Sequence, residues 1–549
     1  MTDRRRAKSP RTGTTTALIL FAAGVAAAAP ATAAARRPQP ARSTIAAPAR
    51  GKAPKPPKPP KPPVFTSGAR TTGDTLFPTI GNGGYDATHY DLDLSYTNVF
   101  SQELKGVATI DATATQNLSD FSLDFQTFAV SKVTVDGRLA AFEFDYVGRK
   151  LIVTPRAGIR RGRRFTVTVA YHGVPAPVID PDGSSEGWVA DPTVGATALG
   201  EPMGSMGWFP SNNVPTDKAT YDISVTTAPD FQAVANGVLA RTTANANDPD
   251  DPADDTTTYE WESDKPMASY LATVSIGRFD TSGSDLSDPS RPLYVYVDTG
   301  FTRAADRIIP TQQRVPEILD WFSGYYGVPY PFEAAGGIVP RVDVGYALET
   351  QSKPTYAGST NPLYTGPSVS TVAHENAHQW FGDLVTLAQW KDIWLNEGIT
   401  EFSSWLWQAN ANGGTTMAAR LTSSLTSTSR TYWVIPPANP PEAGDIFDSN
   451  AMYRRGATTM TAIRQIFLDT PSLGEGAFRA MMKSWLTDHA FGNVTTEQFI
   501  ALVKKTDPAR AARWDEFFQQ WLYTSYPGGT PITPGVTQPS IWPSNFDTP

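Results

Sequence analysis

The chain has 549 residues, of which 40% are hydrophobic, and it contains 14 Trp, 20 Tyr and 26 Phe. This length and composition suit a globular protein of about two to four domains and exclude a largely disordered chain. There is no cysteine, which excludes disulfides, a thiol nucleophile, cysteine-ligated zinc and a lipid-modified cysteine anchor. The first 63 residues hold 13 of the 46 Lys and Arg but one of the 54 Asp and Glu, so the remainder carries about −20. An acidic body argues against nucleic acid as a partner.

The N-terminus has the pattern of a signal peptide over residues 1–35. Basic residues occupy positions 4–11, an apolar run spans 17–29, and small residues suited to cleavage follow at 31–35. We therefore expect a secreted, extracellular bacterial protein that uses the general secretory route, with twin-arginine export as the second possibility. An uncleaved anchor is the alternative, but the apolar run is short for a membrane span and no other segment could cross a bilayer.

Residues 36–67 are predicted to be a linker rich in Pro and Lys. The triplet KPP repeats three times over residues 55–63, which favours a stiff, extended polyproline II spacer. The positive charge could make a weak contact with the cell wall or another anionic surface. A solvated spacer is the simpler interpretation.

Residues 68–277 are expected to form an N-terminal β domain. Short runs alternate apolar and polar residues between Gly, Asn, Asp and Pro, and no long helical period intervenes. This pattern predicts an antiparallel saddle-like sheet or sandwich. The acidic loop 247–255 could bind calcium, but its prolines and spacing do not fit an EF-hand, so we favour a solvated hairpin tip. The clearest strand-like runs are HYDLDLSY (89–96), GVATIDATA (106–114), RFTVTVAYHG (164–173) and DISVTTAP (222–229).

Residues 278–527 are expected to form a mainly helical domain, which makes the whole chain an α+β protein. Residues 293–298 and 336–351 read as strands, whereas 303–326 reads as a helix broken near its two prolines. Residues 528–549 are rich in Pro, Gly, Thr and Ser and predict an extended C-terminal tail. Further helices are expected over 368–384, 397–410, 414–432, 455–470 and within 473–523.

The segment HENAH at 374–378 is the H-E-x-x-H pattern found in zinc metalloproteases. Residues four apart on a helix share a face, so His374 and His378 can bind one cation together. Glu375 lies between them and can reach a water beside the ion without ligating it. Taken alone, this pattern leaves open a chance match on a surface helix.

A third ligand should be a carboxylate or another imidazole, and the chain has only five histidines. The best candidate is Glu397 in WLNEG, far enough after His378 to end one helix and start an antiparallel second one. Glu401 lies one helical turn further and could orient a metal-bound imidazole. We expect one Zn²⁺ per chain, held by His374, His378 and Glu397.

The segments VAHENAHQWFG (372–382) and WLNEG (394–398) resemble the zinc site of the aminopeptidase N family of gluzincins. The segment GNGGYDATHYDLDLSY (81–96) resembles the opening of that family's first domain, so the resemblance covers most of residues 68–527. It implies a β saddle domain followed by a thermolysin-like zinc-peptidase domain. It also implies that the two histidines and Glu397 bind zinc, with the glutamate of H-E-x-x-H as general base.

The same resemblance implies a substrate-binding strand at YALET (346–350). Ala347 matches a residue whose backbone pairs with substrate, and Glu349 matches the glutamate that binds the substrate's α-ammonium group. Two residues depart from the family pattern, since Tyr346 replaces a glycine and Thr350 replaces an asparagine. Both departures would affect the pocket for the side chain of the substrate's first residue more than the binding of its α-ammonium group by Glu349.

Two further roles carry over by resemblance. Glu201 matches a Gln or Glu that lies against the substrate amine, although Leu199 stands where a second Gln is common. Tyr453 matches the tyrosine whose hydroxyl stabilises the oxyanion, with Arg455 in place of the usual lysine.

The predicted function is zinc-dependent hydrolysis of the N-terminal peptide bond of peptides with a free N-terminus. A thermolysin-like zinc endopeptidase is one alternative, and the amine-binding Glu349 argues against it. A catalytically silent surface-binding protein on the same scaffold is another. The intact ligands and base argue against that alternative.

Overall fold

The structure is a computed structural model that describes residues 63–548, except 127, 247–254, 362, 428–429 and 528–532. The expected signal peptide, all but the end of the linker and all but the last residue of the acidic loop lie outside the described residues. No helix in the described ranges is long and apolar enough to cross a membrane.

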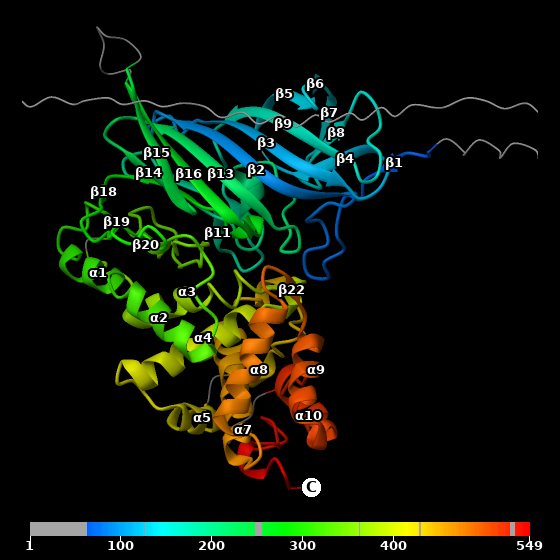
Figure 1. Cartoon of the computed structure of the whole chain (residues 1–549), viewed down its shortest axis with the longest axis vertical. Coiled ribbons are helices and arrows are strands. Elements are labelled where there is room, and N and C mark those ends of the chain that lie inside the picture. Colours follow the sequence, from blue (N-terminus) through cyan, green and yellow to red (C-terminus); the bar gives the residue numbers. More distant parts are fainter. Residues whose placement is uncertain are drawn as a thin grey trace, which may run out of the picture. The chain divides into compact units, whose positions relative to one another are not determined.

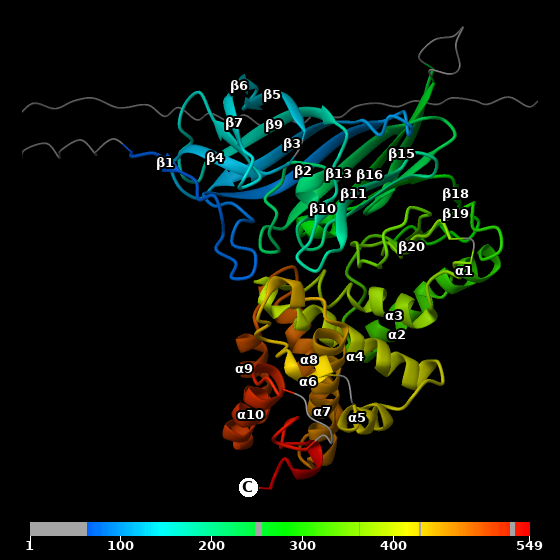
Figure 2. The same ribbon diagram turned by 180° about the vertical axis from the view of Figure 1, so that it is seen from behind.

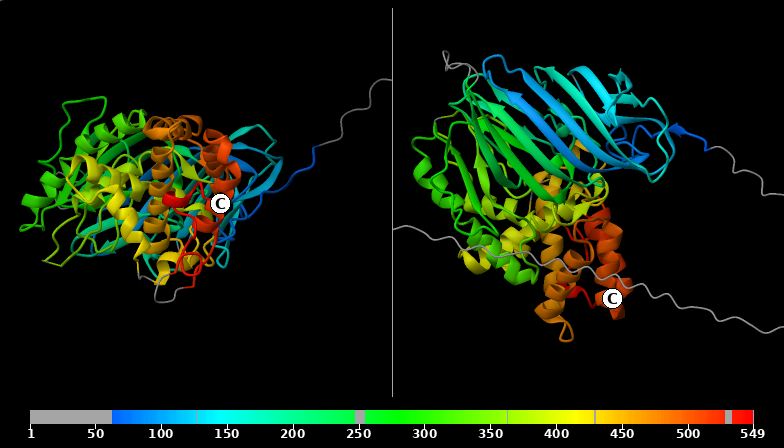
Figure 3. Two further views of the ribbon diagram at one scale, coloured as in Figure 1. Left: turned by 90° about the horizontal axis from the view of Figure 1, so that it is seen from below. Right: turned by 45° about the horizontal axis from the view of Figure 1, so that its top comes forward.

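An eight-stranded sheet is the largest in the described chain (Figure 1, and the right panel of Figure 3). Its strands, in spatial order, are β15 (Val238–Asn245), β16 (Thr256–Met267), β13 (Ala219–Thr227), β2 (Tyr85–Tyr96), β3 (Leu104–Ala114), β9 (Arg164–Gly173), β5 (Ala129–Val135) and β6 (Arg138–Leu139). β2, β3 and β9 alternate buried and solvent-facing residues, as the sequence pattern predicted. The predicted β domain is confirmed, with β13 and β2 as the one parallel pair of neighbours in this sheet.

Two smaller sheets belong to the same domain. The four-stranded sheet has the order β1 (Thr66–Ser67), β4 (Leu118–Asp124), β8 (Lys150–Thr154) and β7 (Ala141–Asp145). The five-stranded sheet has the order β10 (Val178–Ile179), β11 (Ser185–Asp191), β12 (Gly195–Leu199), β17 (Val274–Gly277) and β14 (Gln232–Ala235). Figure 2 shows β10 and β11 on the side of the strands that faces the helices. Since β12 is buried along its whole length and ends at Leu199, it delivers Glu201 to the domain's inner side.

The second half of the chain is mainly helical, which confirms the α+β class. It opens with a three-stranded sheet of β18 (Phe279–Asp280), β19 (Leu293–Asp298) and β20 (Ala335–Val339). A two-stranded parallel ladder joins β21 (Thr386–Leu387) to β22 (Asn493–Val494). The helices are α1 (Ala305–Gln312), α2 (Val315–Tyr326), α3 (Val369–Ala377), α4 (Trp394–Ala411), α5 (Met417–Leu425), α6 (Arg430–Val434), α7 (Gly456–Asp469), α8 (Gly474–Asp488), α9 (Thr496–Thr506) and α10 (Ala511–Phe518).

Helix α3 is shorter than its sequence pattern suggested. The expected helix over 368–384 ends at Ala377, with His378 as its C-terminal cap. Gly382 then adopts a φ of 135°, a conformation that favours glycine, and its amide donates to the Val385 carbonyl at 2.9 Å. The predicted C-terminal end of this helix was wrong. The spacing of apolar residues cannot show where a glycine allows the chain to turn.

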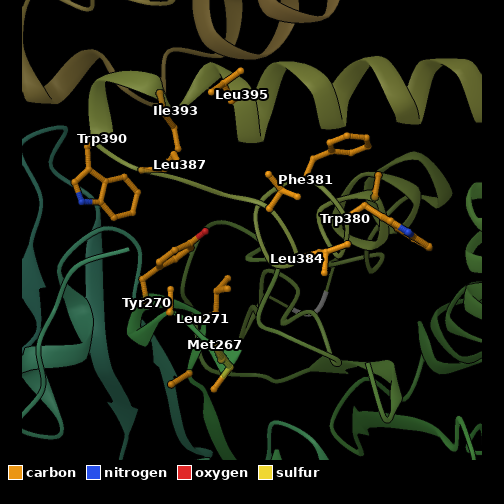
Figure 4. Packing of buried hydrophobic residues seen from close by; sticks show 14 of the residues in the cluster. Met267, Tyr270, Leu271, Trp380, Phe381, Leu384, Leu387, Trp390, Ile393 and Leu395 are labelled. Atoms are coloured by element: carbon orange, nitrogen blue, oxygen red, sulfur yellow. The ribbon is translucent and has the colours of Figure 1, made fainter. Parts of the chain in front are cut away.

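Buried apolar side chains join the β domain to the helical domain (Figure 4). Tyr270, from the β domain, meets Trp390 edge-to-face with ring centroids 5.3 Å apart, and Figure 4 shows Leu271 and Leu387 beside them. The Tyr270 hydroxyl also accepts a hydrogen bond from Asn396 Nδ2 at 3.2 Å. This contact ties the β domain directly to the WLNEG segment, so the two domains share one core.

Helices α4 and α7 approach closely at a pair of glycines. A Cβ atom on Gly398 would lie 2.8 Å from the Gly456 Cα, and a Cβ on Gly456 would lie 2.7 Å from the Gly398 Cα. Such contacts are too short for any other residue without a backbone shift. The crossing therefore sets Glu397 and the segment before Gly456 next to each other.

The prediction of an extended C-terminal tail is wrong for residues 533–548. Trp542 and Phe546 are buried, and Phe546 packs on Trp514 with ring centroids 4.5 Å apart. Trp521 Nε1 donates to the Ile541 carbonyl at 2.7 Å. Burial of two large aromatic side chains offsets the entropy of ordering this Pro- and Ser-rich segment.

Candidate active site

The H-E-x-x-H segment lies at the C-terminal end of α3. Ser368 caps the start of this helix, because its side-chain oxygen accepts the Thr371 amide at 3.0 Å. The helix then carries His374 and Glu375 on its last turn, and His378 caps its end. Glu397 lies in the first turn of α4, against this end of α3.

Three ligand atoms meet between α3 and α4. His374 Nε2 lies 3.1 Å from His378 Nε2 and 3.2 Å from Glu397 Oε2, and His378 Nε2 lies 3.2 Å from the same oxygen. A tetrahedral zinc ion with bonds of about 2.0–2.1 Å places its ligands about 3.3–3.4 Å apart. The triangle therefore has the size for one zinc ion, with a fourth position left for water or substrate.

The outer nitrogens of both imidazoles have acceptors, which leaves the inner nitrogens free to bind a metal. His374 Nδ1 donates to Glu401 Oε2 at 2.9 Å, and His378 Nδ1 donates to the Phe381 carbonyl at 3.0 Å. Because a carboxylate and a carbonyl accept here, each Nδ1 carries a proton, which makes Nε2 the nitrogen of each ring that would bind a metal. Glu401 thus holds the position that the sequence suggested for it.

The third ligand is ionised in this setting. Burial alone would raise the pKa of Glu397, but His378 and His374 act in the other direction and lower that pKa to about 2. A carboxylate that stays ionised is the form that binds a cation. The three donors thus suit zinc in type, spacing and charge.

Glu375 lines the same cavity without belonging to the triangle. One of its oxygens lies within 4.8 Å of an oxygen of Glu349 and a ring nitrogen of His378. Burial raises the pKa of Glu375 to about 7, although the two histidines lower it. A cation held beside it would favour the carboxylate form further.

Two buried carboxylates from distant segments face this cavity. Glu349 and Glu201 are 2% and 7% exposed, and Oε1 of each accepts no hydrogen bond in the described chain. Burial raises the pKa of both groups, and repulsion from Glu397 adds to this. Unpaired buried carboxylate oxygens are costly unless a cation or donor meets them. Both residues line the cavity that holds the ligand triangle.

Tyr453 lies in a π-helical turn, Ser449–Arg455, just before α7. Asp448 caps this turn by accepting the amides of Asn450 at 3.0 Å and Ala451 at 2.8 Å. The Tyr453 ring is nearly parallel to the His374 ring, with centroids 5.8 Å apart. Burial, followed by nearby carboxylates, raises the pKa of Tyr453 well above its ordinary value, so the hydroxyl keeps its proton and can donate.

Arg455 does not face the cavity, although it follows Tyr453 closely. Its side chain is 0% exposed and donates only to backbone carbonyls. Burial lowers its pKa to about 9. Arg455 carries the same positive charge as the lysine of the family pattern. Here that charge binds backbone carbonyls and so holds the segments around Tyr453 together. The carbonyls belong to Trp433, Ile435, Gln520, Trp521 and Thr524.

The stretch that contains Ala347 lines the cavity next to Glu349. Leu348 forms a single bridge with Thr355, with hydrogen bonds of 2.8 and 2.9 Å, instead of a full strand. Within the described ranges no hydrogen bond uses the Ala347 backbone, so its amide and carbonyl are available to a ligand. The Tyr346 hydroxyl donates to the Ser185 carbonyl at 3.3 Å, which links this stretch to β11.

Sequence reasoning missed two residues of this site. Gln379 joins α3 to the Glu349 segment, because its Nε2 donates to the Glu349 carbonyl at 3.1 Å and its Oε1 accepts the Ser352 amide at 2.8 Å. Its place directly after His378 was the one available signal. Arg420, on α5, also lines the cavity, and no motif marks it.

The cavity has a volume of about 940 Å³ and a strongly acidic lining. It brings together every residue that the sequence analysis proposed as a ligand, base, oxyanion donor or substrate contact. These residues come from both domains: Glu201, Ala347, Glu349, His374, Glu375, His378, Glu397 and Tyr453.

Comparisons with known proteins agree with this arrangement. Residues 86–271 match the Peptidase M1 N-terminal domain, and residues 312–521 match the Peptidase family M1 domain. Glutamyl aminopeptidase of Bos taurus is 27% identical over 325 residues, which cover 56% of this chain and 32% of the relative. The human glutamyl aminopeptidase is 31% identical over 217 residues, which cover 38% of this chain and 21% of the relative. The matches thus span a third or less of these relatives.

Solved structures match over a larger share of their length. An M1 zinc metallopeptidase from Deinococcus radiodurans superposes with a TM-score of 0.71 at 25% identity, covering 85% of this chain and 99% of that one. A mutant of that enzyme bound to a Tyr-Ser-Ala substrate gives a TM-score of 0.68 at 25% identity.

Proposed function

This chain belongs to the peptidase M1 family and has the residues of its zinc site, and from that premise we propose that it is a zinc-dependent aminopeptidase. One observation carries the proposal. Glu349 and Glu201 line the cavity that also holds the ligand triangle, and within the described residues Oε1 of each is buried and accepts no hydrogen bond. The contact of Glu349 Oε1 with His378 Nδ1 is 3.8 Å long. A substrate's α-ammonium group is the cation that would satisfy both carboxylates.

The metal's own contribution is that of a Lewis acid, since bound zinc polarises a carbonyl group and lowers the pKa of water. His374, His378 and Glu397 would hold the ion, and Glu401 fixes the orientation of His374. Glu375 is the proposed general base. It would take a proton from water in the cavity and pass that proton to the leaving amine.

Tyr453 is the proposed donor to the oxyanion. Its hydroxyl remains protonated because burial and the surrounding carboxylates oppose ionisation. A neutral donor in a water-poor site stabilises negative charge as the carbonyl carbon becomes tetrahedral. The ring's position against His374 places it beside the metal ligands.

The anchoring of the amine makes the site an exopeptidase site. Glu349 and Glu201 would bind the ammonium group, while the Ala347 backbone would pair with the first residue of the peptide. The first peptide bond then lies over the metal and beside Glu375. An endopeptidase site does not need these two buried charges, and a silent binding protein does not need an intact base.

The direct test is hydrolysis of an aminoacyl p-nitroanilide by the purified protein. We expect turnover that is lost with a chelator and restored by about one equivalent of Zn²⁺ per chain. Hydrolysis of N-acetylated peptides at internal bonds in preference to free-amine substrates would instead identify an endopeptidase. No turnover on either class with zinc bound would identify a silent scaffold.

We also propose that the protein is exported from a bacterial cell, because residues 1–35 have the signal-peptide pattern described above. A mature N-terminus between residues 31 and 36 in protein recovered from culture medium would support this. Protein retained inside cells with an intact N-terminus would refute it.

A further inference from the structure

Arg420 is one of two arginines, with Arg454, in the wall of a mainly acidic cavity. Its guanidinium carbon lies 4.7 Å from the centroid of the Trp405 ring, and its Nη2 donates to Gln408 Oε1 at 3.3 Å. Its Nε is buried and donates no hydrogen bond within the described ranges. An arginine with five N–H groups therefore makes one long hydrogen bond and keeps donors for a ligand.

Nearby carboxylates do not use these donors. Glu401 is close enough to affect the pKa of Arg420, but its Oε2 accepts from His374 Nδ1 at 2.9 Å and its Oε1 accepts from Trp405 Nε1 at 2.6 Å. No ion pair of Arg420 occurs in the described part of the chain. The guanidinium group is thus positioned by stacking and one amide, and its charge is not neutralised by a partner.

Arg420 packs on Trp405, about two helical turns along α4 from the ligand residue Glu397. Glu397, Glu401 and Trp405 follow one another at four-residue intervals along α4. Trp405 is therefore about 12 Å from Glu397 along the helix axis. An extended peptide advances about 3.3–3.6 Å per residue, so this span corresponds to roughly three or four residues.

We propose that Arg420 binds a carboxylate group of the substrate on the leaving-group side of the scissile bond. This subsite rests on the proposed aminopeptidase function. In a tetrapeptide or pentapeptide held by its ammonium group at Glu349 and Glu201, one residue precedes the scissile bond and three or four follow it, so the carboxylate at the C-terminus would reach the guanidinium group. A planar guanidinium matches a carboxylate with two parallel hydrogen bonds. The site then selects short peptides with a free C-terminus.

The test compares free and amidated peptides. We would measure kcat/KM for alanine peptides of two to five residues, each as the free acid and as the C-terminal amide, with alanine p-nitroanilide as a substrate that lacks a carboxylate. For wild-type protein we expect the free acid of four or five residues to exceed its amide by about tenfold, mainly through KM. R420Q should reduce this ratio to near one, and R420K should retain part of it.

The matched control is R454Q. Arg454 also lines the cavity but is exposed, and it donates to Asn450 Oδ1 at 3.1 Å. R454Q should keep the wild-type ratio of acid to amide. An amidated peptide ending in Glu, compared with one ending in Gln, shows whether an acidic side chain can replace the terminal carboxylate. If wild-type protein prefers the Glu peptide and R420Q removes that preference, the result would support the subsite. The carboxylate would then come from the Glu side chain instead of the C-terminus.

Equal rates for acids and amides at every length in wild-type protein would overturn the proposal. So would a loss in R420Q that affects acids, amides and the nitroanilide alike, because that is the effect of a disturbed Glu401. If wild-type protein hydrolyses the nitroanilide but cleaves acids and amides at equal rates, the proposed function stands and only the Arg420 subsite is refuted. Failure on the nitroanilide as well refutes both.

Discussion

Glu375→Gln is expected to lower kcat about a thousandfold while the protein keeps its zinc. The amide has nearly the same shape as the carboxylate but cannot accept a proton at neutral pH, and loss of a general base costs about 10²–10⁴ in rate. Glu375 is not one of the three ligand residues, whose donor atoms lie 3.1–3.2 Å apart. Binding of the ion should therefore survive the change.

The measurement pairs turnover of an aminoacyl p-nitroanilide with zinc content per chain. Glu317→Gln is the matched control, because the Glu317 side chain is 54% exposed on α2 and pairs with Arg314, away from the cavity lining. It should leave both readouts unchanged. Turnover within about tenfold of wild type in the Glu375 variant would exclude the proposed base role.

Glu349→Gln is expected to lower kcat/KM for free-amine substrates about a hundredfold. The carboxylate is buried, and within the described ranges one of its oxygens accepts no hydrogen bond, so the substrate ammonium is its proposed partner. A charged hydrogen bond of this kind contributes about 1.5–3 kcal/mol, and the variant would also leave the ammonium group without its counter-charge. N-acetylated substrates, which carry no charge there, should lose little.

The informative quantity is the ratio of kcat/KM for a free-amine peptide to that for its N-acetylated form. We expect this ratio to fall sharply in the Glu349 variant and to remain at the wild-type value in Glu317→Gln. An equal loss on both substrates would show that Glu349 maintains the structure of the cavity instead of anchoring the amine. Thermal unfolding of each variant separates that outcome from global destabilisation.

Those parts of the site that depend on local spacing could be predicted from the sequence. The pairing of His374 with His378 follows from helical geometry, and the structure brings their Nε2 atoms within 3.1 Å of each other. The alternation in β2, β3 and β9 likewise corresponds to one buried face of a sheet. In each case a repeat of a few residues specifies which side chains share a face.

Residues that converge from distant segments could not be found in this way. Glu201 and Glu349 were proposed only through family resemblance, because no period links two loops that belong to different domains. Arg420 had no signal at all, since its role depends on how α5 packs against α4. The prediction for the C-terminal segment was wrong because it rested on the Pro and Ser content. It did not take into account the aromatic residues whose burial holds the segment against the helical domain.

Arg455 shows a different limit. The sequence showed only that Arg455 stands where the family pattern has a lysine, and in the structure its guanidinium group donates to five backbone carbonyls in the core. Its position in the sequence was informative, but the direction of its side chain was not. Tyr453 and Arg455 lie two residues apart on a π-helical turn, and the first lines the cavity while the second is buried in the core.

Anomalous diffraction at the zinc edge from crystals grown with Zn²⁺ tests the account most directly. We expect one strong peak per chain, about 2.0–2.2 Å from His374 Nε2, His378 Nε2 and a Glu397 oxygen. A peak elsewhere, or a zinc-loaded protein in which Glu397 points away from both imidazoles, would contradict the assignment of this cavity as the catalytic centre.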